Sequence, residues 1–260
     1  MENEFKLTPM EIKNGHYIIN RKKRFTNDIA LTESMKKQVL RFAYDITFGK
    51  KGQHRDHRAE GKIHRNDFQI FFDVFQGKSA EVAFYFFCTE LWGMPEESVS
   101  KPDFSVSPLG IWDSADFTIN GKYISLKSTK DYSNLLLLET SDYDANGDYI
   151  PDRDKDCKHI DYFFFTRVTS VDRIVKLDEC MENGKISFLK IWKLICDNPI
   201  YVNLAGFMTK NDFKKVIHER QIIYAGNHLG AKTRMDVNNY YVQAGDLRRI
   251  KFPNDNQIRV

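Results

Sequence analysis

The sequence of 260 residues has few of the features that mark membrane, secreted or metal-stabilised proteins. No apolar stretch approaches the ~20 residues that a membrane-spanning helix needs, and no positive segment followed by an apolar block opens the chain. The four cysteines are widely spaced and form no Cys-x-x-Cys pair, which favours free thiols over a disulfide framework or a zinc site. We therefore expect a cytoplasmic protein without a membrane partner.

The chain also has little excess charge. Its 39 Lys and Arg against 36 Asp and Glu give a net charge of +3, so composition alone does not indicate a nucleic-acid-binding protein. The 42% of hydrophobic and 29% of charged residues are ordinary globular values, which exclude a disordered or fibrous chain. Charge is segregated, however, because residues 50–65 are basic and residues 142–156 are rich in aspartate.

The domain organisation follows from the absence of internal repeats and low-complexity linkers. One α/β domain over residues 1–260 is the economical expectation. Within it we expect an N-terminal helical and basic arm over about residues 1–65, which includes the basic run Arg21 to Arg24, and a core over about residues 66–250.

Apolar periodicity predicts the main helices. Spacings of three and four residues predict a helix from Thr32 to Phe48 with Thr32 as its cap. A second helical segment is expected from about Asn66 to Trp92, with an interruption near Gly77 and Ser79 as the cap of its later half. A shorter helix is expected over residues 210–220.

The strongest strand signal is a hairpin. Two short β-prone runs flank Asn120 and Gly121, the pair that type I′ turns prefer. The apolar run HIDYFFFTRV at residues 159–168 predicts a central strand, and further strands are expected at 200–204 and 240–243.

The predicted hairpin brings together residue types that phosphodiester chemistry uses. Its register places Asp116 almost opposite Ser125, and the period of two places Ser125 and Lys127 on one face. Phosphodiester cleavage needs a carboxylate that holds Mg²⁺ and a cation that orients water and offsets charge in the transition state. Asp116 and Lys127 would supply both.

The order of Glu81 on a helix, then Asp116, then Ser125-Leu126-Lys127 resembles the PD-(D/E)xK nuclease superfamily, in the variant with Ser in place of the second acid. The segments GKSAEVAFYFF, SADFTINGKYISLKS and IDYFFFTRV are similar to the helix, catalytic hairpin and following strand of these enzymes. GFMTKNDFKK and NNYYVQAGDLRRI resemble the tail of several bacterial type II restriction endonucleases. The resemblance covers about residues 50 to 250.

The resemblance implies a fold and an activity. The fold is an α/β restriction-endonuclease-like core, with a central mixed β-sheet flanked by helices. The activity is Mg²⁺-dependent, sequence-specific cleavage of double-stranded DNA by a type II restriction endonuclease of a restriction-modification system. A palindromic site would imply a homodimer.

The same resemblance implies roles for individual residues. Asp116, Glu81 and the carbonyl of Leu126 would bind Mg²⁺, Lys127 would position the attacking water, and Ser125 would support the site by hydrogen bonding. Glu81 is favoured because a carboxylate on a buried helix needs a partner, and a bound cation offsets its desolvation.

Two positions have rivals. Glu139, twelve residues after Lys127, is the alternative to Glu81 as the acid that replaces the one missing at Ser125. The literal Pro-Asp pair is Pro102-Asp103, which makes Asp103 a rival of Asp116 for the metal. The alternative functions are a catalytically inactive DNA-binding protein of the same fold and a repair or RNA-processing nuclease.

Three other features bear on ligands. The basic segment and the hairpin end suggest DNA contacts by a group of cations: Arg55, Arg58, Lys62, Arg65 and Lys130. Residues 142–148 match the first half of a calcium loop, but Arg153 stands where a bidentate Glu is required, so we expect a polar turn. His54, His57 and His64 have no acid or cysteine cluster at ligand spacing, so we expect polar loop residues.

Overall fold

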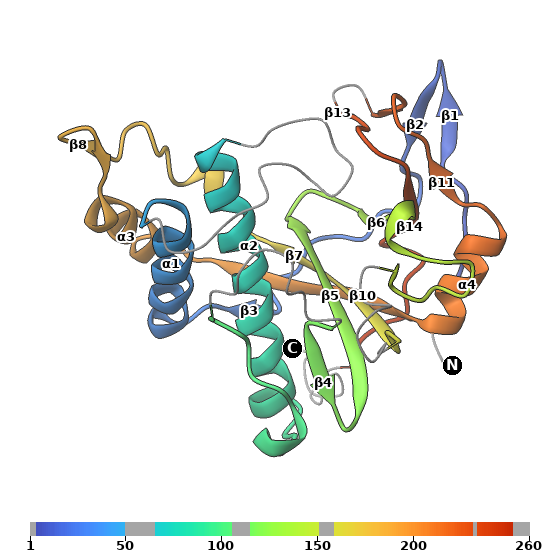
Figure 1. The fold of residues 1–260 in the computed structure, drawn as a ribbon, viewed down its shortest axis with the longest axis horizontal. Coiled ribbons are helices and arrows are strands. Elements are labelled where there is room, and N and C mark those ends of the chain that lie inside the picture. Colours follow the sequence, from blue (N-terminus) through green and yellow to red (C-terminus); the bar gives the residue numbers. More distant parts are fainter. Residues whose placement is uncertain (1–3, 50–65, 106–114, 151–158, 231–232, 252–260) are drawn as a thin grey trace, which may run out of the picture.

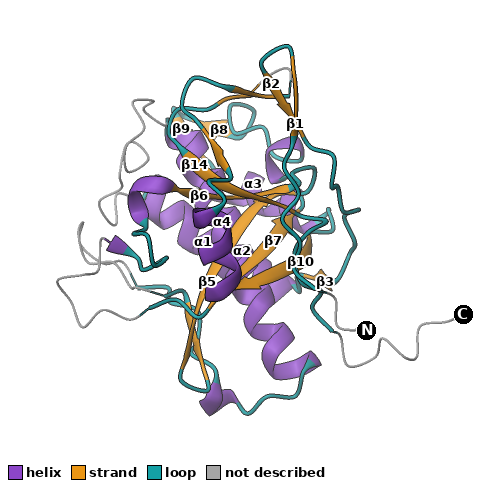
Figure 2. Cartoon of the chain, turned by 90° about the vertical axis from the view of Figure 1, so that its right-hand side faces the viewer, coloured by secondary structure: helices purple, strands orange, loops and turns teal. Residues whose placement is uncertain are grey.

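The computed structural model describes residues 4–49, 66–105, 115–150, 159–230 and 233–251. These residues form a mixed α/β structure in which helices cover one face of a central sheet and a smaller sheet with one helix covers the other (Figures 1 and 2). The helices are α1 (Glu33–Thr47), α2 (Asp67–Phe86), α3 (Phe188–Cys196) and α4 (Lys210–His218). Short helical turns cover Phe87–Leu91 (π-helical), and Glu96–Ser98, Thr140–Asp142 and Val171–Arg173 (3₁₀).

The central sheet has the strand order β3-β10-β7-β5-β4. In that order its strands are Ile29–Ala30, Tyr201–Thr209, Tyr162–Val168, Lys122–Lys130 and Phe117–Ile119. β5 and β7 are parallel and the other pairs are antiparallel, so the central sheet is mixed, as expected. β7 lies in the middle of the sheet, which confirms a central strand within residues 159–168, although it begins at Tyr162.

The smaller sheets lie on the far side of the central sheet from α2. One has the order β11-β14-β6, with the bounds Ile222–Ile223, Asn239–Gln243 and Leu135–Glu139. The other has the order β1-β2-β12-β13, with the bounds Glu11–Lys13, His16–Ile18, His228–Leu229 and Thr233–Arg234. A separate hairpin pairs β8 (Met181–Glu182) with β9 (Lys185–Ile186).

The predicted hairpin is present as β4 and β5. Phe117 pairs with Ile124 and Ile119 with Lys122, which leaves Asn120 and Gly121 as the two-residue turn. Both have positive φ, 47° and 74°. A type I′ turn requires that conformation at both positions, and Asn and Gly adopt it at little cost.

Helix α1 confirms its prediction, since the Thr32 side chain accepts a hydrogen bond from the Met35 backbone N–H at 3.2 Å. The predicted interruption near Gly77 is wrong, because α2 runs unbroken through it. The helix begins at Asn66, whose side chain and that of Gln69 form a capping box, and Ser79 is a buried residue of its interior. A glycine within a helix costs about 1 kcal/mol, which the burial of aromatic side chains on this helix outweighs.

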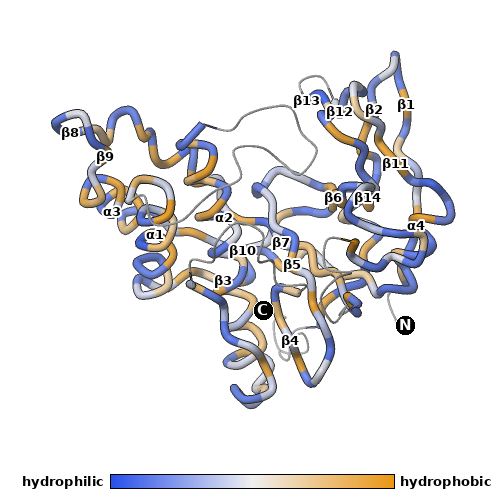
Figure 3. Tube along the Cα trace, in the orientation of Figure 1, coloured by the Kyte–Doolittle hydropathy of each residue, from blue (hydrophilic) through white to orange (hydrophobic). Residues whose placement is uncertain are grey.

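Each face of the central sheet packs against its own apolar core. One core lies between the sheet and the helices and contains Phe84 of α2 and Phe164 of β7, whose rings are 4.8 Å apart. The other lies between the sheet and α4, where Phe163 and Phe213 pack 4.9 Å apart. Figure 3 shows the hydrophobic residues concentrated on the elements that meet at these cores. Within the described residues, no helix is long and apolar enough to span a membrane.

The N-terminal residues contribute strands to two of the sheets, and Arg167 of β7 holds the segment between these strands by hydrogen bonds. Its side chain is 1% exposed, and its guanidinium donates to the carbonyl oxygens of Lys23 at 2.8 Å and Arg24 at 2.7 Å, and to Asn203 Oδ1 at 2.8 Å. The Lys23 ammonium in turn donates to the carbonyl of Ala205. The Arg21 guanidinium donates to Asp246 at 3.1 Å, so three residues of the basic run, Arg21, Lys23 and Arg24, take part in structural hydrogen bonds.

Replacing this buried cation is expected to destabilise the fold strongly. Arg167→Met fills the volume but leaves the two backbone carbonyls and Asn203 without their donor, so the free energy of unfolding should fall by about 3 to 5 kcal/mol. Urea unfolding measures the change. The control is Arg41→Met, which removes an exposed ion pair with Asp45 and should cost less than about 1 kcal/mol. Equal losses in the two variants would contradict the structural role of Arg167.

Candidate active site

Asp116 lies directly before β4 and continues the ladder of the hairpin. Its backbone N–H donates to the carbonyl of Ile124 at 2.9 Å. Its carboxylate Oδ2 accepts hydrogen bonds from the backbone N–H of Leu126 at 2.6 Å and from Ser125 Oγ at 3.3 Å. The predicted juxtaposition of Asp116 and Ser125 is therefore present, and Ser125 holds the acid by a hydrogen bond.

The backbone around Leu126 fits the predicted carbonyl ligand. β4 covers β5 only as far as Ile124, so within the described residues the N–H of Leu126 faces an open strand edge, where it meets Asp116. In a strand, the N–H and C=O of one residue point to the same side. The Leu126 carbonyl therefore faces the same edge as the Asp116 carboxylate.

Ser125 and Lys127 share the face of β5 that lies away from α2. Their partners on β7 are Phe163 and Phe165, which belong to the core on the α4 side, whereas Leu126 lies in the core on the α2 side. The Lys127 side chain is half-buried and forms no hydrogen bond or ion pair with another described residue. An ammonium in that setting is available to a substrate anion.

Glu81 lies on α2, beside the other face of the hairpin. Its side chain is 18% exposed and pairs with the Lys78 ammonium at 2.7 Å. Burial raises the pKa of Glu81 to about 7; Lys78 opposes this rise, and the negative charges of Asp116 and Asp103 add to it. Glu81 and Asp116 are therefore electrostatically coupled, and a cation between them would relieve the repulsion.

Asp103 lies in a turn next to the same helix. Its carboxylate accepts hydrogen bonds from the backbone N–H of Ser105 at 2.7 Å and from Ser105 Oγ at 2.9 Å, and the former bond contributes most to lowering the pKa of Asp103. Its carbonyl accepts a hydrogen bond from Lys78 at 2.6 Å. The carboxylate of Asp103 thus stabilises a local turn, and Lys78 joins that turn to Glu81.

The rival acid Glu139 lies near Tyr143, within range of its hydroxyl group. The Tyr143 ring packs against Phe163, on the face that carries Ser125 and Lys127. Burial raises the pKa of the Tyr143 hydroxyl, and nearby negative charges raise it further. These charges are, in decreasing order, Asp142, Asp116 and Glu139. Asp116 thus lies within electrostatic range of Glu81 and of Tyr143, and Glu139 lies within range of Tyr143 as well.

The acids alone do not complete a metal centre. Among the residues that the structure describes, no three of His, Cys, Asp and Glu are grouped closely enough to hold a metal ion. Mg²⁺ commonly takes only one or two protein carboxylates and fills its other positions with water and substrate phosphate. Two coupled carboxylates with a neighbouring carbonyl fit that chemistry.

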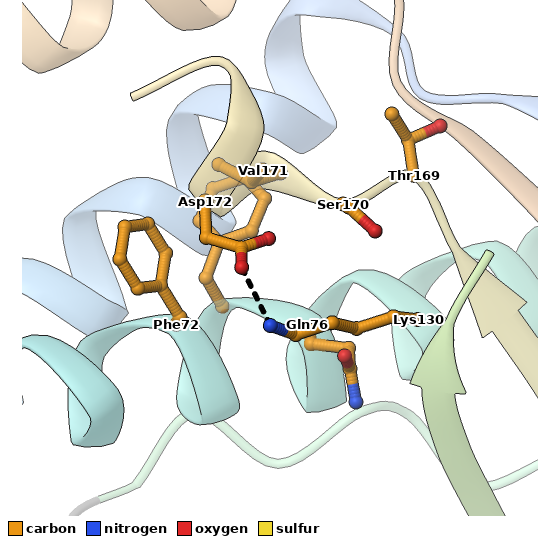
Figure 4. A pocket seen from close by; sticks show the side chains of 8 residues that line it. Phe72, Gln76, Lys130, Thr169, Ser170, Val171 and Asp172 are labelled. Carbon is orange, nitrogen blue, oxygen red and sulfur yellow. Dashed lines mark hydrogen bonds and ion pairs between the residues drawn. The ribbon is translucent and has the colours of Figure 1, made fainter. Parts of the chain in front are cut away.

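Lys130, expected to contact DNA, is held at the end of β5 by an ion pair. Its ammonium lies 2.6 Å from Asp172 Oδ2, and their side chains are about one-third exposed (Figure 4). Burial lowers the pKa of Lys130, but the hydrogen bond and charge of Asp172 raise it more. A small cavity of about 10 Å³, the size of one water molecule, lies beside the pair and next to Gln76 and Ser170 (Figure 4). The charge of Lys130 is therefore already compensated within the protein.

Some of the other residues predicted to bind ligands lie outside the part of the chain that the structure describes. The basic segment with Arg55, Arg58, Lys62 and Arg65, and the histidines His54, His57 and His64, lie outside the described residues. Residues 142–148 form a polar turn, in which Asp144 Oδ1 accepts from the backbone N–H groups of Asn146 and Asp148 at 2.8 and 2.9 Å. Asp148 itself pairs with Lys210. The cysteines that the structure describes are free thiols, as predicted.

The comparisons with known proteins give no support from relatives. No protein family, no curated protein and no solved structure matches this chain. The evidence on function is therefore the arrangement of the residues themselves. The sequence did not single out Lys78, which pairs with Glu81, or Tyr143, which lies within range of the charges of Asp116 and Glu139. Lys78 carried one signal, since it stands three residues before Glu81 on the same helix.

Proposed function

We propose that the protein is a Mg²⁺-dependent DNA endonuclease of the type II restriction class. The observation that supports it best is the hairpin geometry. Asp116 is held by Ser125 and by the Leu126 N–H, and Lys127 directly follows Leu126 and has no ion pair with a described residue. This is the acid, hydroxyl and ammonium arrangement that the resemblance to PD-(D/E)xK nucleases implies, on an α/β scaffold with a mixed central sheet.

Each residue then has a defined role. Asp116 and Glu81 would hold the metal with the Leu126 carbonyl, and the bound metal would supply Lewis-acid activation of the phosphate and of water. Lys127 would orient the attacking water and stabilise the charge that develops on the phosphate. Ser125 keeps the Asp116 carboxylate directed at the strand edge by its hydrogen bond.

The first test separates Asp116 from its rival Asp103. Asp116→Asn preserves the shape and the acceptor for Leu126 but removes the charge. Cleavage of duplex DNA should therefore fall by about 10³-fold or more at every Mg²⁺ concentration. Asp103→Asn should change cleavage by less than about threefold, because its carboxylate serves a surface turn. Initial rates over a Mg²⁺ titration measure both effects.

If Asp103→Asn abolished cleavage and Asp116→Asn did not, Asp103 of the Pro102-Asp103 pair would be the catalytic acid. Duplex DNA that is bound but not cut by the wild-type protein, over all Mg²⁺ and Mn²⁺ concentrations, would favour the alternative of an inactive DNA-binding protein. Cleavage of RNA or of damaged duplex in preference to one short unmodified sequence would favour the repair or RNA-processing nuclease.

A further inference from the structure

The sheet β1-β2-β12-β13 carries a straight row of basic side chains, one from each strand. Its register pairs Lys13 with His16, His16 with His228, and His228 with Arg234. Side chains of directly paired residues point to the same face of a sheet. The four residues therefore form one line across the strands, which we name the basic row.

The basic row lies on the outer face of this sheet. The adjacent register position holds Tyr17 and Leu229, which pack against the core that includes Met10 and Tyr241, with the Tyr17 and Tyr241 rings 6.5 Å apart. Because the period of a strand is two, the basic row points away from that core. Figure 3 shows hydrophilic residues at the turn that joins β1 and β2, at one end of this sheet.

Neither permanent charge of the basic row, Lys13 or Arg234, is strongly compensated by a described residue. The Lys13 ammonium pairs with Glu11 at 2.8 Å, and both side chains are at least half exposed, so solvent weakens this pair. His16 Nδ1 donates to the Gly230 carbonyl at 2.7 Å, which fixes the ring beside that of His228, 5.2 Å away. Arg234 is exposed and has no ion pair with a described residue.

We propose that the basic row binds the phosphate backbone of duplex DNA. Four strands about 4.8 Å apart give a line about 14 Å long. Each strand of DNA presents a phosphate about every 3.4 Å along the helix axis, so a line of this length faces several phosphates in succession. The two histidines lie between the cations, and the His228 ring can donate one N–H to a phosphate oxygen. The proposal rests on the proposed function for its choice of DNA as the polyanion.

The test is the salt dependence of binding without divalent metal, so that cleavage plays no part. Fluorescence anisotropy of a labelled random duplex at several salt concentrations gives the slope of log affinity against log salt. Lys13→Ala with Arg234→Ala should make that slope shallower by about 1.8, at about 0.9 per lost phosphate contact. The matched control is Lys37→Ala with Lys193→Ala, which removes two exposed cations of α1 and α3 and should leave the slope unchanged.

An unchanged slope in the basic row variant, or an equal change in the control, would overturn the proposal. A second variant, His16→Gln with His228→Gln, should weaken duplex binding while the thermal unfolding midpoint stays close to wild type. Preferred binding to vesicles of anionic lipid, lost in the basic row variant, would also overturn it. A wild-type protein that shows the predicted slopes but cuts no DNA would refute the nuclease and leave the basic row as a DNA contact.

Discussion

Lys127→Ala is expected to lower Mg²⁺-dependent cleavage of duplex DNA by about 10²- to 10³-fold or more, with little change in DNA affinity. A preorganised cation beside the scissile phosphate acts mostly on charge that develops in the transition state, so its removal affects the rate more than binding. Lys127 is suited to this role because it directly follows Leu126, whose N–H donates to Asp116, and because it has no ion pair with a described residue.

Single-turnover cleavage and metal-free DNA binding separate the two effects. The matched control is Lys122→Ala on the same strand, which removes an ammonium that pairs with Asp161 near the hairpin turn. The control should cleave within about threefold of wild type, because an exposed ion pair contributes little to stability. If the Lys127→Ala variant were as active as the control, Lys127 would have no catalytic role. The main support for the nuclease proposal would then be lost.

The elements that the sequence predicted well are those with local signals. Thr32 caps α1 through its own side chain, and Asn120-Gly121 forces a two-residue hairpin, so neither depends on distant residues. The hairpin register in turn fixed the juxtaposition of Asp116 and Ser125. The error in α2 has a tertiary cause. Gly77 lowers the local helix propensity, but burial of the aromatic side chains on either side of it favours an unbroken helix.

The contacts that the sequence could not predict join distant residues. Arg167 bonds to residues 143 and 144 positions away, and the basic row joins β2 to β12 across more than 200 positions. Neither pairing leaves a periodic pattern in the sequence, since each depends on how separate strands align in space. For the same reason the electrostatic coupling of Glu81 to Asp116 became visible only once the helix and the hairpin were placed side by side.

The last large effect that we expect comes from replacing Glu81, the proposed second metal-binding acid. Glu81→Gln should lower cleavage by about 10²- to 10³-fold and raise the Mg²⁺ concentration required, because it removes one of the two coupled carboxylates. Glu139→Gln should have a much smaller effect if Glu81 is the second acid, since it leaves the coupled pair of Glu81 and Asp116 intact. Glu90→Gln, at the exposed end of the same helical segment, is the control for an exposed carboxylate.

The pH profile gives an independent check on Glu81. Its pKa is raised to about 7, and a carboxylate must be ionised to bind a cation, so wild-type cleavage at low Mg²⁺ should rise as pH increases through about 7. Saturating Mg²⁺ favours the ionised form and should move the midpoint to lower pH. Loss of activity in Glu139→Gln, with a normal pH midpoint and normal Mg²⁺ dependence in Glu81→Gln, would assign the metal to the face of the sheet that carries Ser125 and Lys127.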